Sequence, residues 1–436
     1  MRHGRAGRWR AAHAGPGRRA LAAAADQALS SGTNVVTLLV AARTLAPAEF
    51  GAVVVALGVG MVAVTAQRAL VGDTLLACGS ALPDEARRPM MRDALATATA
   101  IGALGAAAGL AAGALPYPLT ADVGWMAVWL PAVALQDAYR YAFFCARRPD
   151  QALRADAGWA VVQGAVLLGA LLTGRVTAPV FLAAWGLGGL AGALVGAALA
   201  GLTPVGGRPG RWLRRTRHLS GWFAGQTLVA QSHSQLVVFV VGGALGTAAV
   251  GGLRAIQLIL MLPAQSLLLA AQSMIVPALA RREARGDLDG IRHTVVRLAG
   301  WFTAAAAALA ATVVVVRVPL VDLVFTARFR DYADLVAPLA CATVCYAART
   351  PYTAACRGLR NARGIFLVQA AFTVATVPAV WFGALWWGLA GSAWGLAAGS
   401  AVLLVAAAHT YRRSIEEAAT RRKGIADAPP ARSRLA

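Results

Sequence analysis

The feature that most constrains this chain is a succession of apolar runs, each about 20 residues long, that continues along almost the whole sequence. A helix of that length, rising about 1.5 Å per residue, crosses the roughly 30 Å hydrocarbon core of a bilayer. Only 14% of the 436 residues are charged and 58% are hydrophobic, whereas a soluble protein carries about 25% charged residues. The sequence therefore predicts an all-α, polytopic membrane protein.

The apolar runs predict twelve membrane spans. Prolines at positions 131, 263, 338 and 378 fall inside spans and predict kinks, which neighbouring helices or water can accommodate. The predicted spans are 20–42, 50–77, 94–114, 123–144, 157–173, 177–200, 221–242, 248–278, 295–316, 333–355, 364–385 and 388–410.

Basic residues are distributed unevenly between the predicted loops. If the N-terminus is cytoplasmic, 31 of the 41 Lys and Arg residues lie in inside segments and five in outside loops, and five fall within or at the ends of spans. This asymmetry follows the positive-inside rule and predicts that both termini are cytoplasmic. The net charge of +22 is then explained by contact with anionic headgroups of the inner leaflet, without nucleic acid. A single Lys against 40 Arg, with abundant Ala and Gly, favours a high-GC bacterial genome and hence the bacterial plasma membrane.

The N-terminal stretch "GRRALAAAADQALSS" has a second interpretation, because its twin arginine and small residues are typical of a secretory signal. However, Asp26 and Gln27 interrupt the apolar run, and hydrophobicity resumes through residue 42. We therefore interpret the arginines as the cytoplasmic anchor of the first span.

The five cysteines form no metal-ligand pattern with His and no extracellular pair that would predict a disulfide. We interpret them as small core residues, and the sequence predicts neither a metal site nor a cofactor.

An internal repeat relates the two halves at an offset of 200 residues. "ARTLAPAEFGAVVVAL" (42–57) aligns with "GGALGTAAVGGLRAIQ" (242–257), which matches Gly51 with Gly251. Halves of six helices enter the membrane with the same orientation, as in the parallel repeats of many transporters. We expect a basic tail (1–19), two six-helix lobes (20–200 and 221–411), a cytoplasmic linker (201–220) and a disordered C-terminal tail (412–436).

Polar residues form stripes inside several predicted spans. In the first span they recur at steps of three and four, which places them on one helix face. Polar groups within a span are costly and normally face the bundle interior or a hydrated cavity. Equivalent stripes in both halves predict a shared cavity between the lobes, which would be a substrate pathway. The stripes comprise Asp26, Ser30, Thr33, Asn34 and Thr37 in the first span and Thr227, Gln231, Ser234 and Gln235 in the seventh.

Structural roles compete with a role in the cavity for these residues. Ser, Thr and Gln often join helices by hydrogen bonds, Asp137 and Arg140 could neutralise each other at i, i+3, and arginines near cytoplasmic ends can extend to the headgroups. Arg68 and Arg254 are hardest to explain as anchors, and Asp26 is a candidate protonatable group. The candidate cavity residues are Arg68, Arg254, Asp26, Asn34, Gln231, His233, Gln257, Arg140 and Arg349.

The segment "DQALSSGTNVVTLLVAARTLAPAEFGAVVVAL" resembles the first two helices of polysaccharide flippases in the MOP superfamily, most of all at Leu45, Pro47, Phe50 and Gly51. The loop "LARREARGDLDGIRHTV" is similar to the family's loop after its eighth helix. The resemblance implies a cationic central cavity and alternating access that moves a lipid-linked oligosaccharide between leaflets. It also implies that Arg68 and Arg254 hold the pyrophosphate. Its implied partners are a polyprenyl-pyrophosphate-linked glycan, membrane lipids and other polysaccharide-assembly proteins.

Two other functions remain open. A multidrug or cation antiporter of the same superfamily would need carboxylates in its cavity, and Asp26 would then be central. A membrane polysaccharide polymerase or glycosyltransferase would need catalytic residues on a sizeable outside loop. The longest such loop, 317–332, leaves little room for an active site, so the sequence favours a transporter over an enzyme.

Overall fold

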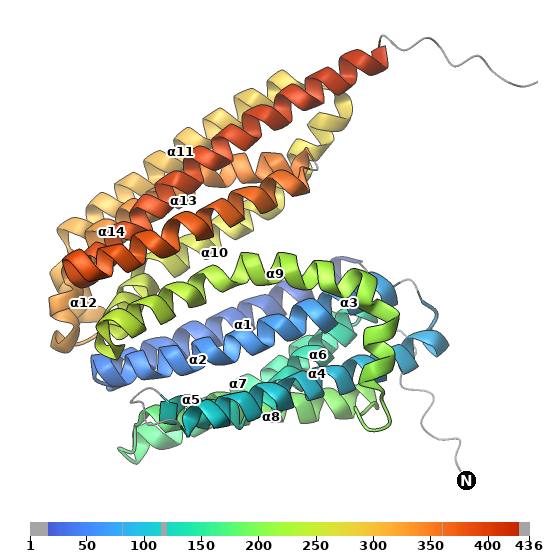
Figure 1. Ribbon diagram of the computed structural model, residues 1–436, viewed down its shortest axis with the longest axis vertical. Helices are drawn as coiled ribbons and strands as arrows, with labels where there is room; N and C mark the ends of the chain where they lie inside the picture. Colours follow the sequence, from blue (N-terminus) through green and yellow to red (C-terminus); the bar gives the residue numbers. More distant parts are fainter. Residues whose placement is uncertain (1–15, 81, 115–119, 360, 427–436) are drawn as a thin grey trace, which may run out of the picture. The chain divides into compact units, whose positions relative to one another are not determined.

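The computed structural model describes residues 16–80, 82–114, 120–359 and 361–426, which fold into helices and turns and no strand (Figure 1). Within these ranges the side chains of some helical residues, among them 218–232, lie outside the described part. Two compact units are present, Met1–Ala255 and Ile256–Ala436. The predicted division into two six-helix lobes at the linker 201–220 concerns topology and remains a prediction.

The first unit is a bundle of long helices built from the chain up to the first turns of the tenth α-helix. Its elements are α1 (Pro16–Thr44), α2 (Pro47–Gln67), the π-helix η2 (Arg68–Gly72), α3 (Asp73–Gly79), α4 (Asp84–Gly113), α5 (Thr120–Ala127), α6 (Leu130–Cys145), α7 (Pro149–Leu172), α8 (Ala178–Ala200), α9 (Pro209–Leu245) and the start of α10 (Thr247–Arg285).

The second unit contains the rest of α10 and the C-terminal helices. These are α11 (Leu288–Val315), α12 (Arg317–Val324), the 3₁₀-helix η3 (Ala327–Leu335), α13 (Val336–Gly358) and α14 (Ala362–Ala426). Trp387 and Gly388 have non-helical backbone angles inside α14, so α14 is two helices separated where the sequence predicts a break between spans.

Each predicted span coincides with helical structure. Seven helices among the described residues are long and apolar enough to cross a membrane, one of them the joined segment Arg363–Thr420 that covers two predicted spans. The other predicted spans lie in α1, α5–α6, α9 and α13. Of these, α6 is short, with 16 residues, and the described apolar part of α9 is His233–Leu245.

Local sequence explains where the helices of the first unit begin and end. At the junction of α1 and α2, Pro47 occupies the first turn, where its missing N–H costs nothing, and Glu49 accepts a hydrogen bond from Ala46 N–H at 3.3 Å. Pro131 likewise lies in the first turn of α6. The predicted kink at Pro131 is therefore an interruption between α5 and α6.

Two glycines of the predicted repeat meet in the first unit where α2 crosses α10. A Cβ atom on Gly51 would lie 1.8 Å from the carbonyl oxygen of Thr247, and one on Gly251 would lie 2.0 Å from that of Pro47. Pro47 and Thr247 differ by 200 residues, as do Gly51 and Gly251. The contact is therefore reciprocal, which supports the predicted duplication.

The end of α2 winds as a π-helix, which places one extra residue in a turn and frees backbone carbonyls. Trp212, in the first turn of α9, is 1% exposed, and its indole Nε1 donates a hydrogen bond to the Leu70 carbonyl at 3.2 Å. The predicted linker therefore packs directly on the turn that follows Arg68.

The C-terminal tail differs from the prediction of disorder, because α14 continues to Ala426. Tyr411, Ile415 and Ala418 are buried in the core of the second unit against residues such as Leu279 and Ile291. This apolar face stabilises the helix beyond the last predicted span. Residues 427–436 lie outside the described residues.

Candidate functional site

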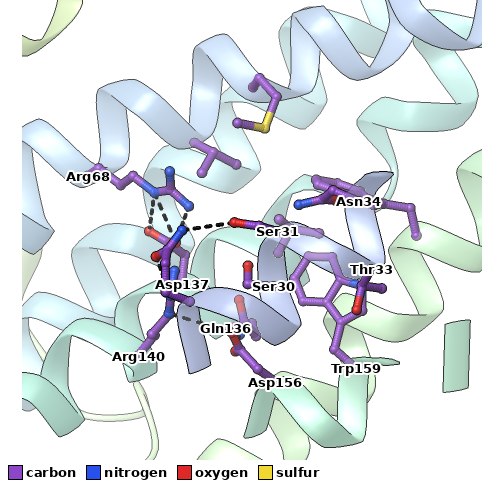
Figure 2. A pocket seen from close by; sticks show the side chains of 15 residues that line it. Ser30, Ser31, Thr33, Asn34, Arg68, Gln136, Asp137, Arg140, Asp156 and Trp159 are labelled. Carbon is purple, nitrogen blue, oxygen red and sulfur yellow. Dashed lines mark hydrogen bonds and ion pairs between the residues drawn. The ribbon is translucent and has the colours of Figure 1, made fainter. Parts of the chain in front are cut away.

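A cavity of about 220 Å³ lies among α1, α2, α6, α7 and α8 of the first unit (Figure 2). The polar stripe of α1 provides one wall, as the sequence predicts. Its lining residues are Gln27, Ser30, Ser31, Thr33, Asn34, Met61, Val64, Arg68, Val133, Gln136, Asp137, Arg140, Asp156, Trp159 and Trp185.

Arg68 and Asp137 form a two-pronged ion pair on the cavity wall. Arg68 Nη2 lies 2.8 Å from Asp137 Oδ1, and Arg68 Nε lies 3.0 and 3.1 Å from the two carboxylate oxygens. The carboxylate is 4% exposed, whereas the guanidinium side chain is 32% exposed to the cavity. Bidentate geometry of this kind is among the stronger polar contacts in proteins, so the charge of Arg68 is already compensated.

Arg140 is the centre of a second charged cluster. Its Nη2 and Nε lie 2.7 and 2.8 Å from Asp26 Oδ2, and Nε is 3.5 Å from Asp156 Oδ2. Gln136 Nε2 donates to the other oxygen of Asp156 at 2.6 Å. Because Arg140 is 13% exposed and Asp26 is fully buried, the alternative in which Arg140 extends to the headgroups is wrong. Pairing of Asp137 with Arg140 is also wrong, since Asp137 binds Arg68.

A hydrogen-bond chain continues from this cavity along α1 and α7. Trp159 Nε1 donates to Gln163 Oε1 at 2.7 Å, and Gln163 Nε2 donates to Thr37 Oγ1 at 2.7 Å. Thr37 Oγ1 in turn donates to the Thr33 carbonyl at 2.8 Å. Satisfied polar groups of this kind hold α1 against α7 and fix the orientation of the cavity wall.

A second cavity of about 210 Å³ adjoins the first, and the two share Asn34, Met61 and Trp185. Arg254, from the first turns of α10, lines this second cavity together with polar groups of α1 and α9 and an apolar wall. The remaining lining residues are Thr37, Leu38, Val54, Leu57, Gly58, Ser234, Gln235 and Val238.

Five of the nine predicted site residues line the two cavities or are bonded directly behind them. Arg68, Asn34 and Arg140 line the first cavity, with Asp26 bonded behind it, and Asn34 and Arg254 line the second. Gln257 lies in the second unit, as does Arg349, whose guanidinium carbon is 4.2 Å from the Tyr346 ring centroid.

His233 is not among the described lining residues of either cavity. The side chain of Gln231 lies outside the described residues. Both cavities belong to the first unit, so the cavity between lobes stays a prediction.

Asp156 lines the first cavity but lies one residue before the predicted span 157–173, so the sequence analysis does not identify it. The helix α7 begins earlier, at Pro149. Asp156, Trp159 and Gln163 recur at steps of three and four, and this spacing could have identified a second polar stripe.

Comparison with known proteins gives a family-model match to part of the chain and several likenesses in fold. A family model described as "Polysaccharide biosynthesis protein" matches residues 194–334. No curated protein matches the chain in sequence.

Solved structures with this fold cover almost the whole chain. An inward-facing multidrug resistance MATE family transporter of the MOP superfamily is 14% identical, with a TM-score of 0.66 over 91% of this chain and 96% of that one. The lipid II flippase MurJ in an inward closed conformation is 9% identical, with a TM-score of 0.67 over 94% and 93%. A MOP superfamily transporter from Pyrococcus furiosus is 11% identical, with a TM-score of 0.61 over 92% and 95%. The predicted fold class is thereby confirmed.

Proposed function

We propose that this chain, a multi-pass membrane protein with the fold of the MOP superfamily, translocates a lipid-linked oligosaccharide across the bacterial plasma membrane by alternating access. The match of residues 194–334 to the polysaccharide biosynthesis family and the likeness in fold to a lipid II flippase support a substrate of this class. Under this proposal the protein is a transporter and not an enzyme.

The observation that carries the proposal is the pair of adjoining cavities with complementary chemistry. The first is lined by hydroxyls, amides and ion pairs, which suit sugar hydroxyls. The second joins Arg254 to an apolar wall that includes Leu38 and Val54. A guanidinium offers a planar set of donors that matches phosphate oxygens, and an apolar wall suits the start of a polyprenyl chain.

The test is a leaflet-accessibility assay in proteoliposomes with a fluorescent polyprenyl-pyrophosphate oligosaccharide. A membrane-impermeant lectin reports how much glycan reaches the outer leaflet. We expect Arg254→Gln to lower the initial rate by about tenfold or more, because a hydrogen bond to a charged group contributes about 1.5–3 kcal/mol. Arg297→Gln is the matched control, since Arg297 is an exposed arginine of α11.

Two results would overturn this assignment. One is a wild-type rate equal to that of empty liposomes. The other is an equal loss in both variants, with each protein remaining monodisperse and folded, because the effect would then not depend on the cavity.

A specific observation favours a second candidate, cation-coupled antiport. Three carboxylates (Asp26, Asp137 and Asp156) surround two guanidiniums, and Asp26 Oδ1 is buried with no hydrogen-bond partner among the described residues. A surplus carboxylate can bind a proton or a small cation. Proton release on addition of an organic cation, lost in Asp26→Asn and kept in the exposed control Asp289→Asn, would favour this candidate over the flippase.

A further inference from the structure

The first cavity has no surplus positive charge, although arginines line it. Arg68 is paired with Asp137, and Arg140 is shared between Asp26 and Asp156. With all five groups ionised the cluster carries a net charge of −1, and a proton on one carboxylate makes it neutral. An anionic group entering this cavity would therefore meet guanidiniums whose charge is already compensated.

The second cavity differs from the first in its described lining residues. Arg254 lines it, and its described lining residues include Asn34, Thr37, Ser234 and Gln235 but no carboxylate. The two cavities therefore favour different parts of a bound molecule. The end of the substrate that carries phosphate is favoured near Arg254, and an uncharged part is favoured in the first cavity.

The boundary between the cavities is suited to a sugar ring. Trp185 and Asn34 line both cavities, and Trp185 is held edge-on against Trp159 with ring centroids 5.2 Å apart. An aromatic ring offers an apolar surface to the C–H face of a sugar, and the neighbouring amide and hydroxyls of α1 can bond its hydroxyl groups.

We infer that the glycan of the substrate is uncharged or carries an amino group at the sugars that enter the first cavity, and that glycans with acidic sugars there are rejected. This inference rests on the proposed function and specifies its substrate class. A carboxylate on the sugar would lie beside Asp137 and Asp156, which line the cavity, with Asp26 buried behind them, and would have no guanidinium of its own. Juxtaposition of like charges in a binding site costs several kcal/mol.

The test uses two labelled substrates with the same polyprenyl pyrophosphate and the same number of sugars. They differ at one sugar, which is a hexose in the first substrate and the corresponding hexuronic acid in the second. We expect the hexose substrate to be translocated at least about tenfold faster, since tenfold corresponds to only about 1.4 kcal/mol. Asp137→Asn removes the partner of Arg68 and should shift the ratio toward the acidic substrate. Asp156→Asn, which removes a different carboxylate from the same cavity, gives a second measurement if Asp137→Asn does not fold. Asp289→Asn, in an exposed ion pair with Arg292, should leave the ratio unchanged.

Each outcome decides between the two proposals. Equal or faster movement of the acidic substrate overturns this inference and leaves the flippase assignment standing. Movement of neither substrate overturns the flippase assignment itself. A ratio that follows the number of carboxylates in the first cavity supports the inference, and a ratio that no cavity variant changes overturns it.

Discussion

Replacement of Gly51 by alanine should destabilise the first unit by forcing two backbones apart. The added Cβ would lie 1.8 Å from the Thr247 carbonyl oxygen and 2.9 Å from the Gly251 nitrogen. Carbon atoms essentially never approach within 3.0 Å of such neighbours, so α2 and α10 must separate by at least 1.2 Å at this point. Both neighbours are backbone atoms that cannot rotate away. Forced overpacking of this kind costs about 1–3 kcal/mol.

The assay is thermal unfolding in detergent, followed by tryptophan fluorescence. A loss of 1 kcal/mol lowers Tm by about 2–4 °C in proteins of 150–250 residues and by less in longer chains, so we expect a decrease of a few degrees. Gly243→Ala is the matched control, because a Cβ there meets nothing within 4 Å and alanine favours a helix over glycine. Its Tm should be unchanged or slightly higher.

The reciprocal contact makes a sharper prediction for the double variant. Gly251→Ala acts on the same crossing, with its Cβ 2.0 Å from the Pro47 carbonyl oxygen. Once one Cβ has separated the helices, the second meets less resistance, so the loss in Gly51→Ala/Gly251→Ala should be smaller than the sum of the single losses. A Tm for Gly51→Ala at or above that of Gly243→Ala, or strict additivity, would refute the reasoning.

Three further predictions concern charges and hydrogen bonds of the first unit. Asp137→Asn should lower stability by less than the 3–5 kcal/mol typical of a broken buried ion pair, because Arg68 is 32% exposed. The double variant Asp137→Asn/Arg68→Gln should recover part of this loss. Equal unfolding midpoints for the single and the double variant would contradict this. Burial raises the pKa of Asp122 above its ordinary value, so the folded state favours the protonated form and loses stability as pH rises through that range. Asp122→Asn should therefore raise Tm near neutral pH but not below the ordinary aspartate pKa of about 3.9, and a gain that persists at the lower pH would show another cause. Trp212→Phe removes the donor to Leu70 and should cost about 1 kcal/mol; faster amide exchange over 68–74 by mass spectrometry is expected, and unchanged exchange there would contradict the prediction.

Much of the fold could be predicted because its signals are local. Apolar runs long enough to cross a bilayer predicted twelve spans, each of which coincides with helical structure, and the steps of three and four between Asp26, Ser30 and Thr33 placed the stripe of α1 on one face. The offset of 200 residues aligned Gly51 with Gly251 as equivalent positions of a repeat, and the structure places these two positions in contact.

The pairing of charges could not be predicted, because it depends on which helices are neighbours. Asp137 has Arg140 at i+3, yet it binds Arg68, which lies 69 residues away in sequence. Spacing in the sequence favours Arg140 as the partner of Asp137, whereas the packing of α2 against α6 brings Arg68 to it. The pairing matters for the cavity, because the charge of Arg68 on its wall is already compensated by Asp137.

The π-helical turn at Arg68–Gly72 also constrains how the chain can change in length over evolution. Deletion of one residue from this turn would restore α-helical winding and rotate the preceding part of α2 against α3 by about 100°. Arg68 would then leave Asp137, while Leu75 of α3 stays fixed in its core. Related proteins that keep both charged residues should therefore keep the same number of residues through this turn, and a one-residue gap in an alignment here should coincide with loss of the pair.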